Sequence, residues 1–124
     1  MEQLRYVVLH HTGIPDPHYD LMVEPGPGAT ALATWRVPAW PVRGMVVVHR
    51  LADHRAAYLT FEGDVTGNRG RVSRVRGGQC WVERDRDVFV VTFDRGEVVR
   101  LWPAGDGAWL AAPVGTIRAE PTDA

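Results

Sequence analysis

The sequence predicts an all-β protein, a compact closed or partly closed β-barrel of about eight short strands with at most one or two short helical turns. Short runs rich in β-branched and aromatic residues recur along the chain. Clusters of glycine, proline and aspartate separate these runs roughly every ten residues. No segment has the periodicity of a long amphipathic helix, and barrel closure would remove the exposed edges that so many short strands would otherwise leave.

The first half of the chain contains expected strands over residues 4–10, 18–24, 30–37 and 44–51. Gly13 and two nearby prolines predict a loop between the first two strands, and the proline–glycine run 25–28 ends the second. The third strand is centred on Trp35. The fourth contains three consecutive valines, 46–48, which indicate a strand that is buried on both faces or closed in a barrel.

Residues 53–58 are expected to form one helical turn with Asp53 as its N-cap. Further short strands are expected over residues 59–62, 69–75, 80–84, 88–93, 98–102 and 109–112. Gly77 and Gly78 are expected to turn the chain, and the last three strands are expected to form consecutive hairpins. Residues 115–124 are polar and are expected to form a frayed tail.

Length and composition indicate a single soluble domain over residues 1–124. Cys80 is the single cysteine, so no internal disulfide can form and a reduced, cytoplasmic setting is expected. We find neither an export signal nor a run of apolar residues long enough to span a membrane. The formal net charge of −1 gives no overall basic field for nucleic acid. Every basic residue is an arginine, which suits phosphate, although a GC-rich genome would produce the same bias.

A candidate metal site begins at His18 and Asp20. On a strand these two side chains share one face, because side chains alternate from residue to residue. His10 and His11 lie at the end of the preceding strand and face opposite ways, so only one of them joins the site unless a bulge intervenes. Imidazole and carboxylate ligands of this kind hold Mn²⁺ or Zn²⁺ with open positions. The alternative is that these groups are ordinary surface residues beside a turn.

His54 and Tyr58 form a second candidate cluster. At positions i and i+4 of a helical turn their side chains lie on the same side. Taken alone, His54 would be a solvent-exposed residue beside a cap, and Tyr58 a core aromatic with its hydroxyl group at the surface.

These clusters and the segment between them occur in an order and spacing that one family shares. The segments are His10-His11, His18-Tyr19-Asp20-Leu21, Thr34-Trp35-Arg36-Val37-Pro38, Asp53-His54-Arg55-Ala56-Ala57-Tyr58 and Phe61-Glu62-Gly63. Over residues 7–76 the chain resembles the 3′-phosphoesterase domain of bacterial DNA ligase D and its stand-alone relatives. The third segment is similar to that family's Ser-Trp-x-Val-Pro motif.

The resemblance implies a β-barrel enzyme that depends on Mn²⁺, with Zn²⁺ as another candidate ion, and that removes 3′-phosphates and 3′-terminal ribonucleotides from DNA ends. It implies His10, His18 and Asp20 as metal ligands. His11 is the alternative to His10, because the loop that follows is longer than in typical family members. The resemblance also implies that His54 and Tyr58 contact the scissile phosphate. The implied partners are DNA or RNA–DNA 3′ ends and a separate DNA ligase or polymerase.

The chain departs from the family motif at Met22, where the family has an arginine on the same strand face as the ligands. Loss of such a charge-assisted contact to a phosphate costs about 10²-fold or more in rate. Arg36 or Arg50 are candidates to supply the missing charge. Arg69 and Arg71 belong to a basic cluster that is a candidate DNA contact, although a solvated hairpin face explains the same pattern.

Two other functions fit the sequence. Met22 is consistent with a member that has lost turnover and acts as a binding module for nucleic-acid ends or for a repair partner. The near-neutral charge is consistent with a phosphoesterase that acts on a small nucleotide instead of a long duplex.

Overall fold

A computed structural model describes residues 2–115 of the chain. The elements are β1 (Gln3–Thr12), β2 (His18–Val23), β3 (Ala31–Val37), β4 (Val46–Arg55), the 3-10 turn η1 (Ala56–Leu59), β5 (Gly63–Asp64), β6 (Arg71–Asp85), β7 (Val88–Phe93), β8 (Val98–Gly105) and β9 (Ala108–Pro113). All strand pairs are antiparallel. The predicted all-β class is therefore confirmed.

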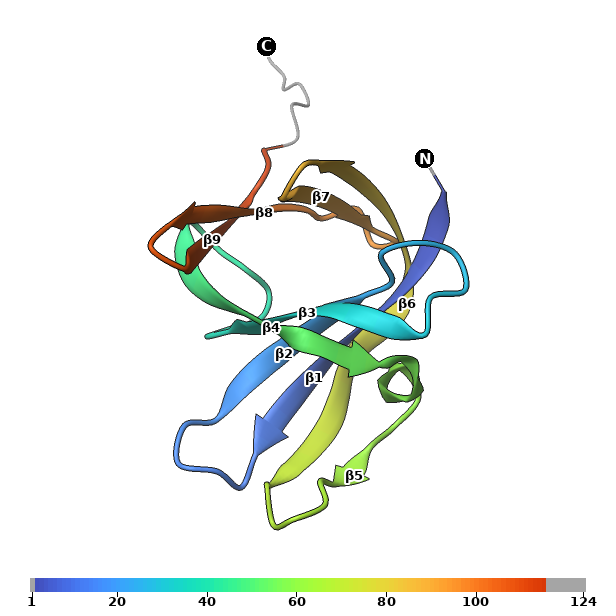
Figure 1. Ribbon diagram of the computed structural model, residues 1–124, viewed down its shortest axis with the longest axis vertical. Helices are drawn as coiled ribbons and strands as arrows, with labels where there is room; N and C mark the ends of the chain where they lie inside the picture. Colours follow the sequence, from blue (N-terminus) through green and yellow to red (C-terminus); the bar gives the residue numbers. More distant parts are fainter. Residues whose placement is uncertain (1, 116–124) are drawn as a thin grey trace.

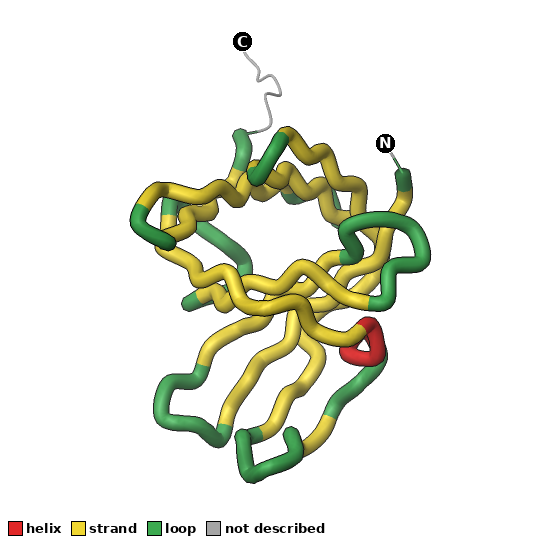
Figure 2. Tube along the Cα trace, in the orientation of Figure 1, coloured by secondary structure: helices red, strands yellow, loops and turns green. Residues whose placement is uncertain are grey.

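Eight of the strands close into a barrel (Figure 1). Their order around the barrel is β1-β2-β3-β4-β9-β8-β7-β6, and β6 returns to pair with β1. The short β5 pairs with the first residues of β6 and lies outside this ring. Figure 2 shows η1 beside the end of the sheet, on the segment that leads from β4 to β5. Closure leaves no free edge among the eight barrel strands, as expected for so many short strands.

Several local predictions are wrong. Residues 59–62 form no strand, since η1 ends at Leu59 and β5 begins at Gly63. The cap of η1 is Arg55 and lacks a side-chain hydrogen bond, whereas Asp53 pairs with Arg50 at 3.3 Å. The predicted frayed tail, residues 115–124, lies outside the described residues except for its first position.

Gly77 and Gly78 do not turn the chain. They continue β6, opposite Val7 and Tyr6 of β1. A Cβ atom at Gly78 would overlap the carboxylate of Asp94. The two glycines therefore leave room for neighbouring side chains within a strand, and no turn is needed to explain them.

One apolar core fills the barrel. Its largest members are aromatic rings that meet edge to face, as at Trp35 and Phe89, whose centroids are 4.9 Å apart. Val48 is buried in this core, but Val47 is 57% exposed, so the prediction of a fourth strand buried on both faces is wrong. Barrel closure, the alternative interpretation of the three valines, is correct. Cys80 is buried in the same core, as predicted, and burial raises the pKa of its thiol to about 12.

A second, smaller core lies on the outer face of the barrel wall. Its buried members are Val7, Leu9, Met22, Leu32, Leu59 and Val72. The segment 56–70, which contains η1 and β5, covers this core, and we call it the roof segment. β1 is therefore buried on both faces, because its even-numbered residues enter the barrel and its odd-numbered residues lie under the roof segment. Among the described residues, no helix is long and apolar enough to cross a membrane.

Candidate active site

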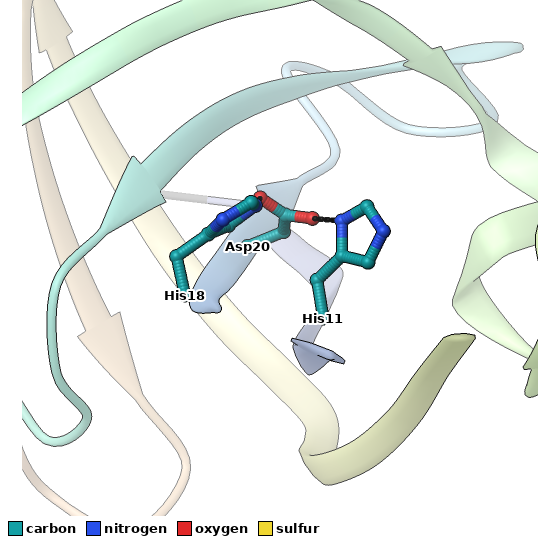
Figure 3. A group of neighbouring side chains, drawn as sticks. All are labelled: His11, His18 and Asp20. Carbon is teal, nitrogen blue, oxygen red and sulfur yellow. Dashed lines mark ion pairs between the residues drawn. The ribbon is translucent and has the colours of Figure 1, made fainter. Parts of the chain in front are cut away.

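Three potential metal ligands converge where the outer core ends. The register places His11 of β1 directly opposite His18 of β2, with Asp20 two residues further along the same face. One ligand atom from each of these residues lies within 4.8 Å of those of the other two. Figure 3 shows the three side chains gathered at one point, with a dashed line that joins His11 to the carboxylate of Asp20.

His10 does not belong to this cluster. It follows the even-numbered residues of β1 to the other face, where its ring stacks on Tyr19 with centroids 4.4 Å apart. The choice of His10 over His11 as a ligand is therefore corrected by the geometry. The physical reason is strand alternation, since the pairing of His11 with His18 fixes which of two adjacent imidazoles faces Asp20.

Backbone carbonyls fix the orientation of both imidazoles in the cluster. The Nδ1 atom of His18 lies 2.8 Å from the carbonyl oxygen of Asp16, and the Nε2 atom of His11 lies 2.7 Å from that of Arg69. Because a carbonyl oxygen only accepts hydrogen bonds, each of these nitrogens carries a proton. In the neutral rings, Nε2 of His18 and Nδ1 of His11 then present lone pairs to Asp20. Such carbonyl anchoring is typical of histidines that bind metal ions.

The carboxylate of Asp20 completes a set of acceptors. Its oxygens lie 3.2 Å from Nε2 of His18 and 3.7 Å from Nδ1 of His11. Both His18 and Asp20 are 4% exposed. Oδ1 of Asp20 makes no hydrogen bond with the described residues, although Nε2 of His18 lies 3.2 Å away. A cation between the two lone pairs and the buried carboxylate would satisfy all three groups, so the cluster fits a divalent metal ion.

His54 and Tyr58 line the same cleft as His18 and Asp20. Their rings lie edge to face with centroids 5.5 Å apart, so the predicted side-by-side arrangement is present. The Nδ1 atom of His54 donates a hydrogen bond to the carbonyl of Ala52 at 2.9 Å, which leaves Nε2 as the second ring nitrogen. The cleft has a volume of about 130 Å³.

A β-bulge brings His54 to this face. Leu51 pairs with Thr34 and His54 pairs with Leu32, so the register shifts by one residue between these pairs. In a regular strand Leu51 and His54, three residues apart, would point to opposite faces. The bulge lets both line the cleft. Residue 54 therefore reaches the site from a strand, and only Tyr58 is on the helical turn.

The four predicted arginine contacts separate into two groups. Arg36, opposite Asp20 on β3, and Arg69, on the roof segment, line the cleft. Nε of Arg36 is buried and has no hydrogen-bond partner among the described residues. Arg50 does not line the cleft, because it packs over the barrel-core ring of Trp35 at 4.8 Å. Arg71 is exposed, pairs with an aspartate of β5 and does not line the cleft either.

Sequence reasoning missed that the backbone carbonyls of Asp16 and Arg69 accept hydrogen bonds from the imidazoles and so orient them. These contacts are made by the backbone, so no residue type marks them in a sequence. Met22 lines the same cleft, on the strand face expected for it, and also packs in the outer core. No family model matches this chain, and no curated protein matches it either.

Proposed function

We propose that this protein is a metal-dependent phosphoesterase of the DNA ligase D 3′-phosphoesterase type, which removes 3′-phosphates or 3′-terminal ribonucleotides from DNA ends during repair. The main support is one geometric observation. A triad of metal-ligand residues, two of them buried, shares a single cleft with His54, Tyr58 and Arg36, whose Nε has no hydrogen-bond partner among the described residues. Phosphoester hydrolysis needs this combination, namely a cation site, a proton donor and an anion contact in one place.

The metal ligands in this proposal are Nδ1 of His11, Nε2 of His18 and the carboxylate of Asp20. Mn²⁺ is the proposed ion and Zn²⁺ the alternative, since two imidazoles and one carboxylate suit both. When bound, such an ion polarises a phosphoryl oxygen and lowers the pKa of a coordinated water. Metal binding would also remove the cost of burying the carboxylate of Asp20.

The remaining cleft residues act on the phosphate. His54, held by its Nδ1 proton on Ala52, would protonate the leaving oxygen or donate to a non-bridging oxygen through Nε2. The hydroxyl group of Tyr58 would add a second hydrogen bond. Arg36 would supply the positive charge that the family motif places at residue 22, because it lines the cleft and its buried Nε has no hydrogen-bond partner among the described residues. The proposed partners are DNA or RNA–DNA 3′ ends and a separate DNA ligase or polymerase, in the reducing cytoplasm.

The direct test is to incubate the protein with Mn²⁺ and DNA that ends in a 3′-phosphate or a single 3′-ribonucleotide. We expect product to form, and we expect His54→Ala and Arg36→Ala each to lower the rate about 10²- to 10³-fold, the usual cost of losing a transition-state hydrogen bond. Arg71→Ala is the matched control, because this arginine lies outside the cleft. A wild-type protein that leaves both ends intact contradicts the phosphoesterase function. An Arg36→Ala variant as active as the control contradicts the role of Arg36 as the phosphate contact.

Met22 favours one alternative, a binding module without turnover. Its side chain is buried in the outer core at the position where the family carries an arginine, so the cleft has lost a charge there. In the same assay this alternative predicts retention of the 3′-phosphate end without processing. Hydrolysis of a small nucleotide but not of DNA ends would instead indicate the third function, which the net charge of −1 tolerates.

A further inference from the structure

A second pocket lies on the roof segment, next to the cleft that contains His11, His18 and Asp20. We call that cleft the metal cleft. The second pocket has a volume of about 170 Å³ and is lined by Arg55, Tyr58, Phe61, Asp64, Val65 and Thr66. Tyr58 and Val65 also line the metal cleft, so these two side chains form a shared wall. The two cavities are therefore neighbours, separated only by these two side chains.

Aromatic rings lead from the cleft into the pocket. The ring of Tyr58 lies between those of His54 and Phe61, with centroid distances of 5.5 Å and 5.6 Å. The rings of Tyr58 and Phe61 are almost perpendicular, with an interplanar angle of 87°. Two such rings form the corner of a pocket into which a third, planar ring can pack against the face of one and the edge of the other.

Phe61 is an exposed aromatic residue on a segment that is held in place. Its side chain is 37% exposed, although it lies beside the buried outer core. Arg74 of β6 clamps the chain on both sides of it, because its backbone N–H donates to Glu62 at 2.6 Å and its guanidinium donates to the carbonyl of Leu59. A Cβ atom at Gly77 would overlap this guanidinium. The fold thus holds an apolar ring at the surface, and such exposed apolar surface is typical of a ligand-binding site.

We propose that this pocket, which we call the ring pocket, binds the planar heterocycle of a nucleoside whose phosphate lies in the metal cleft. The proposal rests on the proposed phosphoesterase function, and it names the part of the substrate that the cleft itself does not contact. Bases stack on aromatic side chains and on arginine planes, and Phe61, Tyr58 and Arg55 provide both. Such stacking tolerates all bases, so we expect the terminal nucleoside to be held with little base preference.

The test compares two phosphoesters with Mn²⁺ and the full chain. Adenosine 3′-monophosphate carries a heterocycle, whereas glycerol 2-phosphate carries none. Stacking contributes about 1–3 kcal/mol per base, so we expect Phe61→Ala to raise the KM for the adenosine compound about 5- to 100-fold. The KM for glycerol 2-phosphate and the kcat for both compounds should change little. Phe61→Tyr is the matched control, because it keeps an aromatic face and should retain the wild-type KM.

Two outcomes overturn the ring pocket: an equal rise in KM for both compounds, or no rise for the adenosine compound. If neither compound is hydrolysed, equilibrium binding of unphosphorylated adenosine, followed by NMR, decides the pocket, and the assay on DNA 3′ ends decides the proposed phosphoesterase function separately. Binding that Phe61→Ala weakens and Phe61→Tyr preserves supports the pocket in that case. Absence of binding, or binding that Phe61→Ala leaves unchanged, overturns it. Thermal unfolding of both variants checks that each retains the fold.

Discussion

The two faces of the sheet formed by β1, β2 and β3 differ in what covers them. The inner face is covered by the other barrel strands and is apolar, with Trp35 packed between Phe89 and Trp109. Among residues 2–115, the segment that packs on the outer face is the roof segment. The outer face is apolar at Val7 and Leu9 but ends in the imidazole and carboxylate groups of the metal cleft.

This difference shows how one set of strands serves both folding and chemistry. A closed barrel shields its interior from water, so a polar group there needs a protein partner, as the hydroxyl group of Tyr6 has in Asp94 and Arg76. The roof segment leaves one end of the outer face open, and buried carboxylate and imidazole groups can exist there because a cation and backbone carbonyls can satisfy them. The stability of the protein should therefore depend mainly on the inner face, and its chemistry on the outer face.

The largest expected effect is on the free energy of unfolding, when a large side chain is truncated in the inner or the outer core. Trp35→Ala should lower the free energy of unfolding by about 3–5 kcal/mol, because a fully buried ring leaves a cavity that the barrel cannot close. Leu59→Ala in the outer core should cost about 2 kcal/mol, at the low end for leucine, since the roof segment can settle onto the sheet. Urea denaturation measures both. Val47→Ala, at an exposed site, serves as the control. Equal losses in the two cores would show that the roof segment is as rigid as the barrel.

The second effect is stabilisation of the fold by a metal ion, which tests whether the cluster on the outer face binds one. At a Mn²⁺ concentration about 100 times its Kd, binding should add about 2.7 kcal/mol of stability and raise Tm by roughly 10 °C. EDTA should reverse this shift. His11→Ala and His18→Ala should abolish it, whereas the adjacent His10→Ala should retain it, because residue 10 faces the other way.

Differential scanning fluorimetry with and without Mn²⁺ measures these shifts. His10 and His11 differ only in the face they occupy, so the pair is a matched test of strand alternation. A shift that disappears in His10→Ala and persists in His11→Ala would contradict the register of β1 and β2. A wild-type protein without any shift would remove the metal from the proposed function.

The smallest expected effect concerns ionisation at the inner face. Burial raises the pKa of Tyr6 to about 12, with Arg76 opposing the rise and a hydrogen bond to Asp94 adding to it. The folded protein thus holds this proton more tightly than the unfolded chain, whose tyrosine pKa is about 10.0. The resulting stabilisation is complete below about pH 10 and should be lost as the pH rises to about 12. Urea denaturation across this range, with phenolate absorbance, measures the loss. If Tyr6→Phe loses stability over the same pH window as the wild type, another group is responsible.

Much of the fold follows from local patterns. Alternation and valine-rich runs were sufficient to predict most of the strands that build the barrel, because a half-buried strand must place apolar residues on every second position. The same alternation limited the metal ligands to His18, Asp20 and one of two adjacent histidines. It could not choose between His10 and His11, since that choice depends on the partner strand that each residue meets.

Where prediction failed, a bulge or a close contact had changed the meaning of the pattern. The register of β1 and β6 shifts between Val8 and Leu9, so Arg74 and Arg76 point to opposite faces although they are two residues apart. The mixed polarity of this strand is the result. Gly77 suggests a turn by its residue type, yet here it provides space for a guanidinium.

The sequence by itself determined the all-β class, the strands and the kinds of chemical group available, because backbone propensity and side-chain periodicity are properties of neighbouring residues. Tertiary structure alone decided which groups meet. Two bulges set the faces of His54 and Arg74, and pairing across strands selected His11. Carbonyls of Asp16 and Arg69 then oriented the imidazoles. These are relations between distant segments, and no window of sequence contains them.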